Sequence, residues 1–166
     1  GAHGFMAEYF TSPAEYLVRI PDSLAPLGFL VEPLSITAKA VELAEASRST
    51  FEWDPEVALV LGNGSLGLLT LAVLGREYDR TYCVGRRDRP DPTVDVIESL
   101  GATYVDSRET SVEGIPESHE AADLVVEATG YPPHALDPVH AVAPNGVLAL
   151  LGASDSMSHE LDAGAY

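Results

Sequence analysis

The clearest hydrophobic pattern lies in the middle of the chain, where an unbroken apolar run is followed by glycines and then by a second apolar stretch. The run Val57–Leu61 carries no polar residue and ends at a glycine, which is typical of a strand buried on both faces. The stretch from Leu68 to Gly75 is almost wholly apolar and completes a segment long enough for a buried helix. The pattern therefore predicts a strand, a tight turn and a helix in succession.

The turn contains glycines at the spacing Gly62-x-Gly64-x-x-Gly67. Such a spacing between a strand and a helix is typical of a dinucleotide-binding turn, in which the first glycine permits the turn and the second lets a diphosphate approach the backbone. The third lets the helix pack closely on the sheet, and the free N–H groups of the helix face the anion. The alternative is a glycine-rich turn that binds nothing.

Apolar strands and helices alternate through the rest of the chain. Pro92 to Leu100 is predicted to be a helix with Val94 and Ile97 facing inward and Gly101 as its stop, and a short helix is expected near Glu117. Further strands are predicted at Thr81–Val84, Thr103–Val105, Asp123–Glu127 and Val147–Leu151, with a helix over about 133–142 and a turn at Asn145-Gly146. This alternation predicts an α/β fold with a doubly wound parallel sheet, of which five strands are found where six are usual.

The first part of the chain has a different pattern. Residues 1–24 begin without methionine and contain two short patterned segments, Gly4–Tyr9 and Tyr16–Ile20, which are expected to be strands. We interpret them as a strand-rich remnant of a preceding domain, and residues 25–166 as the cofactor-binding domain, truncated at its C-terminus. A helix is expected to begin at Pro33. Its inner face is predicted to contain Ile36, Ala40, Leu43 and Ser47.

The charge of the chain is strongly negative. Nine basic residues against 26 acidic ones give a formal net charge of −17, which argues against nucleic acid as a partner. Self-repulsion of this size becomes tolerable near 1 M salt, where the Debye length is roughly 3 Å. We interpret the acidic surface as adaptation to a salty cytoplasm, with an ordinary acidic protein as the alternative. The sequence shows no long apolar span and no signal peptide, and its one cysteine, Cys83, is expected to be an inert hydrophobic residue. The chain is therefore expected to be cytoplasmic and not associated with membranes.

The residues after the second strand set the expected cofactor. The sequence Gly85-Arg86-Arg87-Asp88-Arg89 begins about 20 residues past the glycine turn, at the position where a carboxylate binds the ribose 2′-hydroxyl of NAD and arginine accommodates the 2′-phosphate of NADP. Guanidinium groups bind phosphate in a bidentate manner, so Arg86 and Arg87 predict NADP, with NAD bound more weakly. The alternative is a solvated loop with surface ion pairs.

Two segments and one carboxylate complete the candidate site. Ala128-Thr129-Gly130 and Leu151-Gly152-Ala153 follow strands at the sheet edge that binds ligands, so they are candidates to contact the nicotinamide end, or are ordinary turns. Glu32 lies in an apolar setting and is either a zinc ligand or a carboxylate that stabilises a helix N-terminus. The five histidines are scattered and are expected to be surface or core residues: His3, His119, His134, His140 and His159.

Several strings resemble the medium-chain alcohol dehydrogenase superfamily. They are Gly4-Phe-Met-Ala-Glu-Tyr9, Tyr16-Leu-Val-Arg-Ile-Pro-Asp22, Glu32-Pro33, the Gly62–Gly67 turn and Leu100-Gly-Ala102. Three longer strings resemble the zinc-dependent glucose 1-dehydrogenases of halophilic archaea: Leu61–Thr70, Gly85–Pro92 and Ala143-Pro-Asn-Gly146. The resemblance covers essentially the whole chain.

The resemblance implies that β-D-glucose is oxidised at C1 to gluconolactone, with hydride passing to NADP and zinc acting as a Lewis acid. It gives Glu32 as zinc ligand and sugar contact, and it places the other ligands in a preceding GroES-like catalytic domain. It assigns Asn63, Gly64, Ser65 and Leu66 to the diphosphate, and Arg86 and Arg87 to the 2′-phosphate. The partners expected are glucose or a related sugar and further copies of the chain in a homo-oligomer, a dimer or a tetramer. The alternatives are another zinc-dependent polyol or alcohol dehydrogenase and a non-catalytic NADP-sensing module.

Overall fold

The computed structural model describes residues 7–50, 53–130 and 136–152. The chain divides into two compact units, residues 1–31 and residues 32–166. The first half of the predicted strand Gly4–Tyr9 lies outside the described residues, as do His3, His134, His159 and Ala153.

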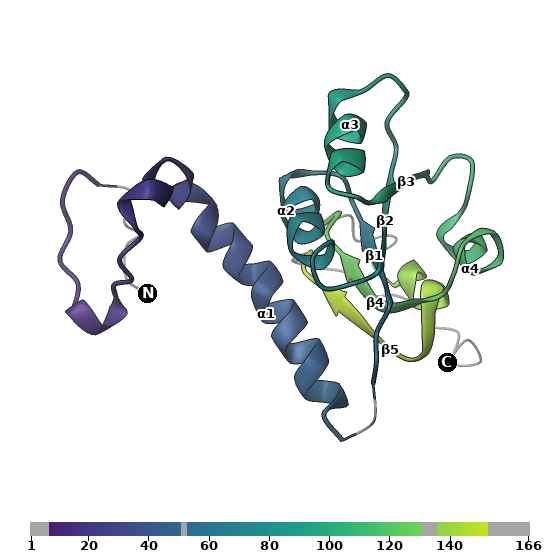
Figure 1. Cartoon of the computed structure of the whole chain (residues 1–166), viewed down its shortest axis with the longest axis horizontal. Helices are drawn as coiled ribbons and strands as arrows, with labels where there is room; N and C mark the ends of the chain where they lie inside the picture. Colours follow the sequence, from purple (N-terminus) through teal and green to yellow (C-terminus); the bar gives the residue numbers. More distant parts are fainter. Residues whose placement is uncertain (1–6, 51–52, 131–135, 153–166) are drawn as a thin grey trace. The chain divides into compact units, whose positions relative to one another are not determined.

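The second unit is built on a parallel sheet (Figure 1). Its strands are β1 (Val57–Leu61), β2 (Arg80–Gly85), β3 (Thr103–Asp106), β4 (Ala122–Glu127) and β5 (Val142–Leu150). The order across the sheet is β3-β2-β1-β4-β5, and every neighbouring pair is parallel. All five residues of β1 are buried, as the unbroken apolar run predicts for the central strand of such a sheet. The doubly wound fold predicted from the sequence is confirmed.

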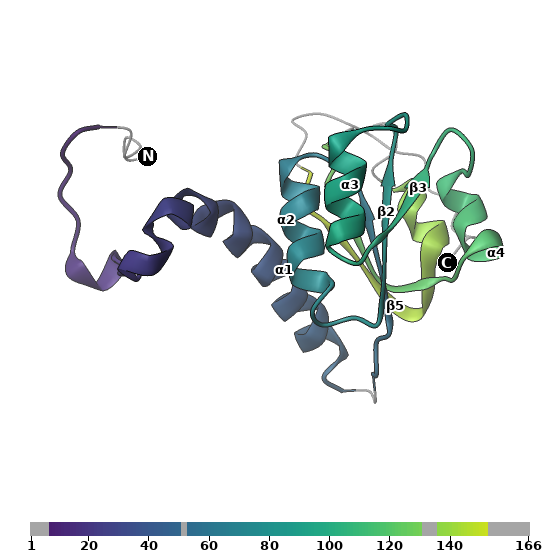
Figure 2. The ribbon, with the colours of Figure 1, turned by 45° about the horizontal axis from the view of Figure 1, so that its top comes forward.

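Helices cover both faces of the sheet (Figures 1 and 2). The helices that contribute to the core of one face are α1 (Val31–Arg48), α2 (Ser65–Leu74) and α3 (Pro92–Ser99). The other face is covered by η3 (Val112–Gly114), α4 (Ile115–Ser118) and η5 (Asp137–Ala141). The predicted helix that ends before Gly101 is confirmed, and Gly101 has the positive φ of 84° that favours glycine after a helix.

The packed face of α1 differs from the one predicted. The buried residues are Thr37, Ala40, Val41 and Ala44. Ile36 and Leu43 are 40% and 56% exposed, so the prediction that they face inward is wrong. Small side chains on the packed face let α1 approach α2, where the hydroxyls of Thr37 and Thr70 lie 3.0 Å apart. Pro33 is the third residue of α1 and not its first.

The described part of the first unit contains no strand. It has two 3₁₀ helices, η1 (Ala14–Tyr16) and η2 (Asp22–Leu30), each preceded by a proline. The prediction of a strand at Tyr16–Ile20 is therefore wrong. A strand needs a neighbour for its backbone N–H and C=O groups, and the described residues of this unit provide none. By length and composition alone, Asp22–Arg48 is apolar enough to cross a membrane, but one helix of this kind is weak evidence because core helices meet the same criterion.

The last strand also begins earlier than predicted. β5 runs from Val142 through Asn145 and Gly146, where a turn was expected, and its register with β4 shifts between Ala122 and Leu124. Asn145 has a φ of 64°, so the asparagine forms an irregularity within the strand and not a turn before it. Of the helix predicted over 133–142, the described part is the 3₁₀ helix η5, and residues 131–135 lie outside the described residues.

Candidate cofactor site

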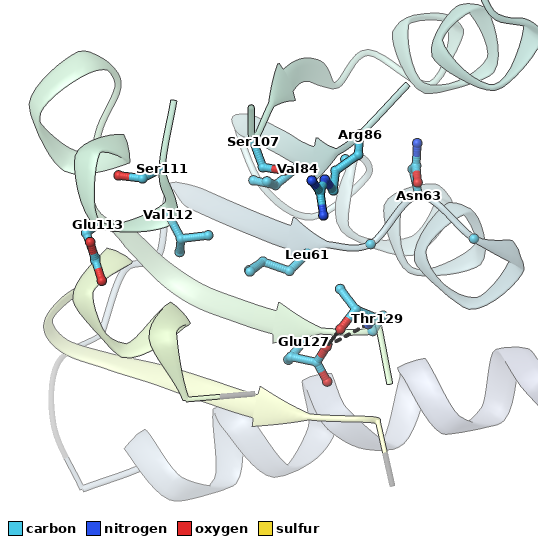
Figure 3. A pocket seen from close by; sticks show the side chains of 14 residues that line it. Leu61, Asn63, Val84, Arg86, Ser107, Ser111, Val112, Glu113, Glu127 and Thr129 are labelled. Atoms are coloured by element: carbon cyan, nitrogen blue, oxygen red, sulfur yellow. Dashed lines mark hydrogen bonds between the residues drawn. The ribbon is translucent and has the colours of Figure 1, made fainter. Parts of the chain in front are cut away.

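A cavity of about 700 Å³ opens at the carboxyl ends of β1, β2 and β4 (Figure 3). The strand order reverses between β1 and β4, and open α/β sheets bind ligands at such a point. The cavity is lined by Leu61, Gly62, Asn63, Gly64, Val84, Gly85, Arg86, Ser107, Ser111, Val112, Glu113, Glu127, Ala128 and Thr129. The structure thus brings together three segments that the sequence predicted as cofactor contacts: the glycine turn, the start of the arginine loop and the end of β4.

The glycine turn has the geometry that a dinucleotide-binding turn requires. Gly62 has a φ of 105°, and its N–H donates a hydrogen bond to the carbonyl of Val84 at 2.9 Å. A Cβ on Gly67 would lie 1.9 Å from the carbonyl oxygen of Gly62, so only glycine lets α2 approach β1 this closely. Because α2 begins at Ser65, directly after the cavity-lining Gly64, its unpaired N–H groups lie beside the cavity. Leu66 is also in this first turn of α2; Ser65, Leu66 and Gly67 do not themselves line the cavity.

The segment 85–89, which begins at the last residue of β2, is held by several contacts. The N–H of Arg87 donates to the Tyr104 hydroxyl at 2.5 Å, and a Cβ on Gly85 would lie 2.7 Å from Nδ2 of Asn63. Arg89 pairs with Glu98 at 2.5 Å. The sequence alternative of surface ion pairs thus describes part of this loop.

The two candidate arginines differ in their surroundings. Arg86 lines the cavity and makes no ion pair with any described residue, whereas Arg87 does not line it and has its Nη1 3.9 Å from Oδ2 of Asp91. Figure 3 shows the side chain of Arg86 directed toward the cavity from the end of β2. Arg86 is therefore the cation best placed to meet an anionic group bound in the cavity.

Glu127 is a site residue that sequence reasoning missed. It is the last residue of β4, is 1% exposed and lines the cavity. Its Oε1 accepts a hydrogen bond from the Thr129 N–H at 2.7 Å and another from the Thr129 hydroxyl (Figure 3). A Cβ on Gly152 would lie 2.5 Å from its Oε2. This carboxylate therefore fixes the turn after β4 beside the end of β5, and the signal in the sequence was a carboxylate that ends an apolar strand.

Leu151 and Gly152 lie next to the cavity lining without belonging to it. The N–H of Leu151 donates to the carbonyl of Glu127 at 2.9 Å, which extends the β4–β5 pairing by one residue. Sequence reasoning also missed the wall formed by the segment after β3, which consists of Ser107, Ser111, Val112 and Glu113. The polar composition of this segment gave no periodic signal.

The described residues do not form a metal site by themselves. Among them, no group of three or more His, Cys, Asp or Glu side chains is placed to hold a metal ion. Glu32 is exposed in the first turn of α1, the position in which a carboxylate also stabilises a helix N-terminus. Cys83 is fully buried in β2, and its burial raises the pKa of the thiol to about 12, as expected of an inert side chain.

Comparisons with known proteins show relatives that are more than 60% identical to this chain. The chain is 63% identical over 169 residues to a glucose 1-dehydrogenase of Haloferax mediterranei, a match that covers 100% of this chain and 47% of that protein. It is 64% identical over 154 residues to the glucose 1-dehydrogenase of Halobacterium salinarum, covering 92% of this chain and 43% of that protein. The chain thus spans about half the length of these relatives.

The structural comparison leads to the same group of proteins. The chain matches the structure of Haloferax mediterranei glucose dehydrogenase in complex with NADP, Zn and gluconolactone with a TM-score of 0.91 and 63% identity. This match covers 99% of this chain and 47% of that one. The resemblance predicted from the sequence motifs is confirmed. A family model described as "Glucose dehydrogenase C-terminus" matches residues 25–166, and the chain belongs to this family.

Proposed function

We propose that this chain is the NADP-binding part of a zinc-dependent glucose 1-dehydrogenase, which oxidises β-D-glucose at C1 to gluconolactone. The observation that carries the proposal is the cavity at the reversal of strand order, in a chain 63% identical to a glucose 1-dehydrogenase. There the glycine turn meets Arg86, which has no ion-pair partner among the described residues. NADP⁺, when bound, would accept the hydride.

The residues of the cavity fit the parts of NADP. The diphosphate would lie at the N-terminus of α2, against the turn formed by Gly62, Asn63, Gly64, Ser65, Leu66 and Gly67. The 2′-phosphate would be held by the Gly85–Arg87 segment, in which Arg86 is directed into the cavity and the backbone of Arg87 is fixed by Tyr104. NAD, which lacks this phosphate, would bind more weakly. Ala128, Thr129, Leu151 and Gly152 would contact the nicotinamide end.

The buried Glu127 has a positioning role in this proposal. Its carboxylate satisfies the N–H and the hydroxyl of Thr129, and so it holds the backbone after β4 where the nicotinamide would lie. A fixed backbone at this place orients the ring for hydride transfer and limits the entry of water.

We propose that Glu32 contributes to a zinc site that is completed by residues of the longer protein. The described residues do not fit a zinc site alone, so the chemistry at the metal depends on ligands from the catalytic domain of which residues 1–24 would form the end. The whole protein would act on glucose or a related sugar as a cytoplasmic homo-oligomer, a dimer or a tetramer, without nucleic-acid or membrane partners. Its negative charge supports the exclusion of nucleic acid.

Calorimetry and a glucose assay test this proposal. The full-length protein should bind NADP⁺ more tightly than NAD⁺, reduce NADP⁺ with glucose, and lose turnover on treatment with a zinc chelator. The 166-residue chain alone should bind NADP⁺ without oxidising glucose. Turnover by that chain alone would contradict the proposal that oxidation of glucose needs the catalytic domain. Absence of NADP⁺ binding by the full-length protein would refute the cofactor site. NADP⁺ binding with oxidation of another polyol or alcohol would favour a different zinc-dependent dehydrogenase. NADP⁺ binding with no oxidation would favour a non-catalytic NADP-sensing module.

A further inference from the structure

Arg108 bridges two carboxylates beside the cofactor cavity. Its Nε lies 2.9 Å from Oδ1 of Asp106, and its Nη2 lies 2.5 Å from Oδ2 of the same carboxylate. The same Nη2 lies 2.8 Å from Oδ1 of Asp88. Asp106 is the last residue of β3 and Asp88 belongs to the loop after β2, so one guanidinium joins the ends of two neighbouring strands.

This cluster of Arg108, Asp106 and Asp88 adjoins the wall that carries Arg86. Asp106 is the register partner of Gly85, and the N–H of Ser107 donates to the carbonyl of Gly85 at 2.9 Å. Ser107 and Arg86 both line the cavity, and Figure 3 shows them along the same side of it. The two carboxylates are thus neighbours of the cation that we assign to the 2′-phosphate.

The Asp106 carboxylate keeps its negative charge. Hydrogen bonds from the side chain and backbone of Arg108 lower the pKa of the Asp106 carboxyl to about 2, and the charge of Arg86 acts in the same direction. An ionised carboxylate at this edge of a dinucleotide-binding sheet accepts a hydrogen bond from the ribose 2′-hydroxyl of NAD and repels the 2′-phosphate of NADP. Without a cation to offset their charge, Asp88 and Asp106 would therefore favour NAD over NADP.

We propose that Arg108 is a specificity-determining residue, which favours NADP over NAD by offsetting part of the negative charge of Asp88 and Asp106 beside the 2′-phosphate position. It does so without touching the cofactor itself: its guanidinium engages both oxygens of Asp106 and Oδ1 of Asp88, and its positive charge weakens their opposition to Arg86. The inference rests on the proposed NADP-binding function and adds to it a residue outside the cavity lining.

The test is Arg108→Gln in the full-length protein, with Kd for NADP⁺ and NAD⁺ measured by calorimetry. The variant removes one positive charge and exposes two negative ones, so we expect NADP⁺ affinity to fall about tenfold at moderate salt and less at molar salt. NAD⁺ affinity should stay the same or rise. Adding Asp88→Asn and Asp106→Asn to Arg108→Gln should restore most of the NADP⁺ affinity, which a merely structural role of the bridge would not allow.

Arg80, at the other end of β2 from the loop that carries Asp88, provides a matched control. It is the first residue of β2, and its guanidinium also bridges two carboxylates, Glu56 at 2.7 Å and Glu120 at 3.0 Å. Its side chain is 45% exposed against 38% for Arg108. Arg80→Gln therefore makes the same change of charge at the end of β2 that lies away from the cavity. It should leave the ratio of the NADP⁺ and NAD⁺ affinities unchanged.

A second variant keeps the test decisive if Arg108→Gln folds poorly. The Asp88 side chain is 87% exposed, so Asp88→Asn should fold normally, and it should raise the preference for NADP⁺ severalfold because Arg108 stays charged. The inference is overturned if Arg108→Gln weakens both cofactors equally, if the triple variant stays as weak as Arg108→Gln, or if Asp88→Asn leaves the preference unchanged. A wild-type protein that did not prefer NADP⁺ would instead refute the proposed function.

Discussion

Replacing Gly64 and Gly67 separately by alanine should separate cofactor binding from folding. The two positions are three residues apart in one turn, but an added methyl group meets different surroundings in each. At Gly67 the Cβ would lie 1.9 Å from the carbonyl oxygen of Gly62 and 2.9 Å from its carbonyl carbon. At Gly64 it would have no heavy atom within 4 Å, and the backbone there, with φ −81° and ψ −174°, is extended and open to any residue.

These contacts give the size of each effect. The overlap at Gly67 is roughly 1.5 Å inside ordinary van der Waals separation and involves backbone atoms that cannot rotate away. We expect Gly67→Ala to cost about 3 kcal/mol, the upper end of overpacking, and to lower Tm by several degrees. Gly64→Ala should be neutral or stabilise by about 0.4–1 kcal/mol, because alanine restricts the unfolded chain. Its methyl group would enter the space offered to the diphosphate, and we expect NADP⁺ affinity to fall roughly ten- to a hundredfold.

Thermal melts without cofactor and calorimetry with NADP⁺, both on the full-length protein, give the two readouts for each variant. Unperturbed melting combined with weak binding in Gly64→Ala is the combination that places the diphosphate at this turn. Wild-type affinity in Gly64→Ala would show that the diphosphate lies elsewhere, and wild-type melting of Gly67→Ala would show that α2 does not pack on β1 as closely as described.

Three further predictions concern charge and burial. Arg86→Ala with Arg87→Ala should lower NADP⁺ affinity by roughly ten- to a thousandfold, at about 1.5–3 kcal/mol for each hydrogen bond to a charged group, and hardly change NAD⁺ affinity. Of the two single variants, Arg86→Ala should account for most of the loss of NADP⁺ affinity, and the control Lys39→Ala should lower the affinity for both cofactors equally and slightly. An equal loss of NADP⁺ and NAD⁺ affinity in the double variant would argue for general electrostatic attraction. Because the chain carries a net charge of −17, Tm should rise from low to molar KCl, and a flat or falling series would contradict the interpretation of the acidic surface. Burial raises the pKa of the Cys83 thiol to about 12, so Cys83 should resist iodoacetamide at pH 8 until the protein unfolds, and rapid labelling of the folded protein would show that the thiol is accessible. Because folding disfavours the thiolate, the stability of the protein should fall as pH rises above about 8.5, the pKa of an unfolded thiol.

The parts of the fold that could be predicted from the sequence are those that local chemistry specifies. An apolar run ending in Gly62 specifies a buried strand and its turn whatever surrounds it, and the structure confirms both. The packed face of α1 could not be predicted in this way. Helical periodicity shows which residues share a face, but Ile36 and Leu43 fit one face as well as Thr37 and Ala44 fit another. The contact between Thr37 and Thr70, residues far apart in the chain, identifies the face that packs.

The candidate site shows the same limit for charged residues. The sequence places Arg86, Arg87 and Arg89 in one short loop but gives no reason to treat them differently. Their roles depend on partners from elsewhere in the chain: Glu98 on α3 pairs with Arg89, and Asp91 lies near Arg87. Arg86 alone among the three lines the cavity and has no ion-pair partner among the described residues. A count of charges predicts that this edge of the sheet attracts phosphate, whereas the arrangement of the neighbouring carboxylates determines which guanidinium is free to bind it.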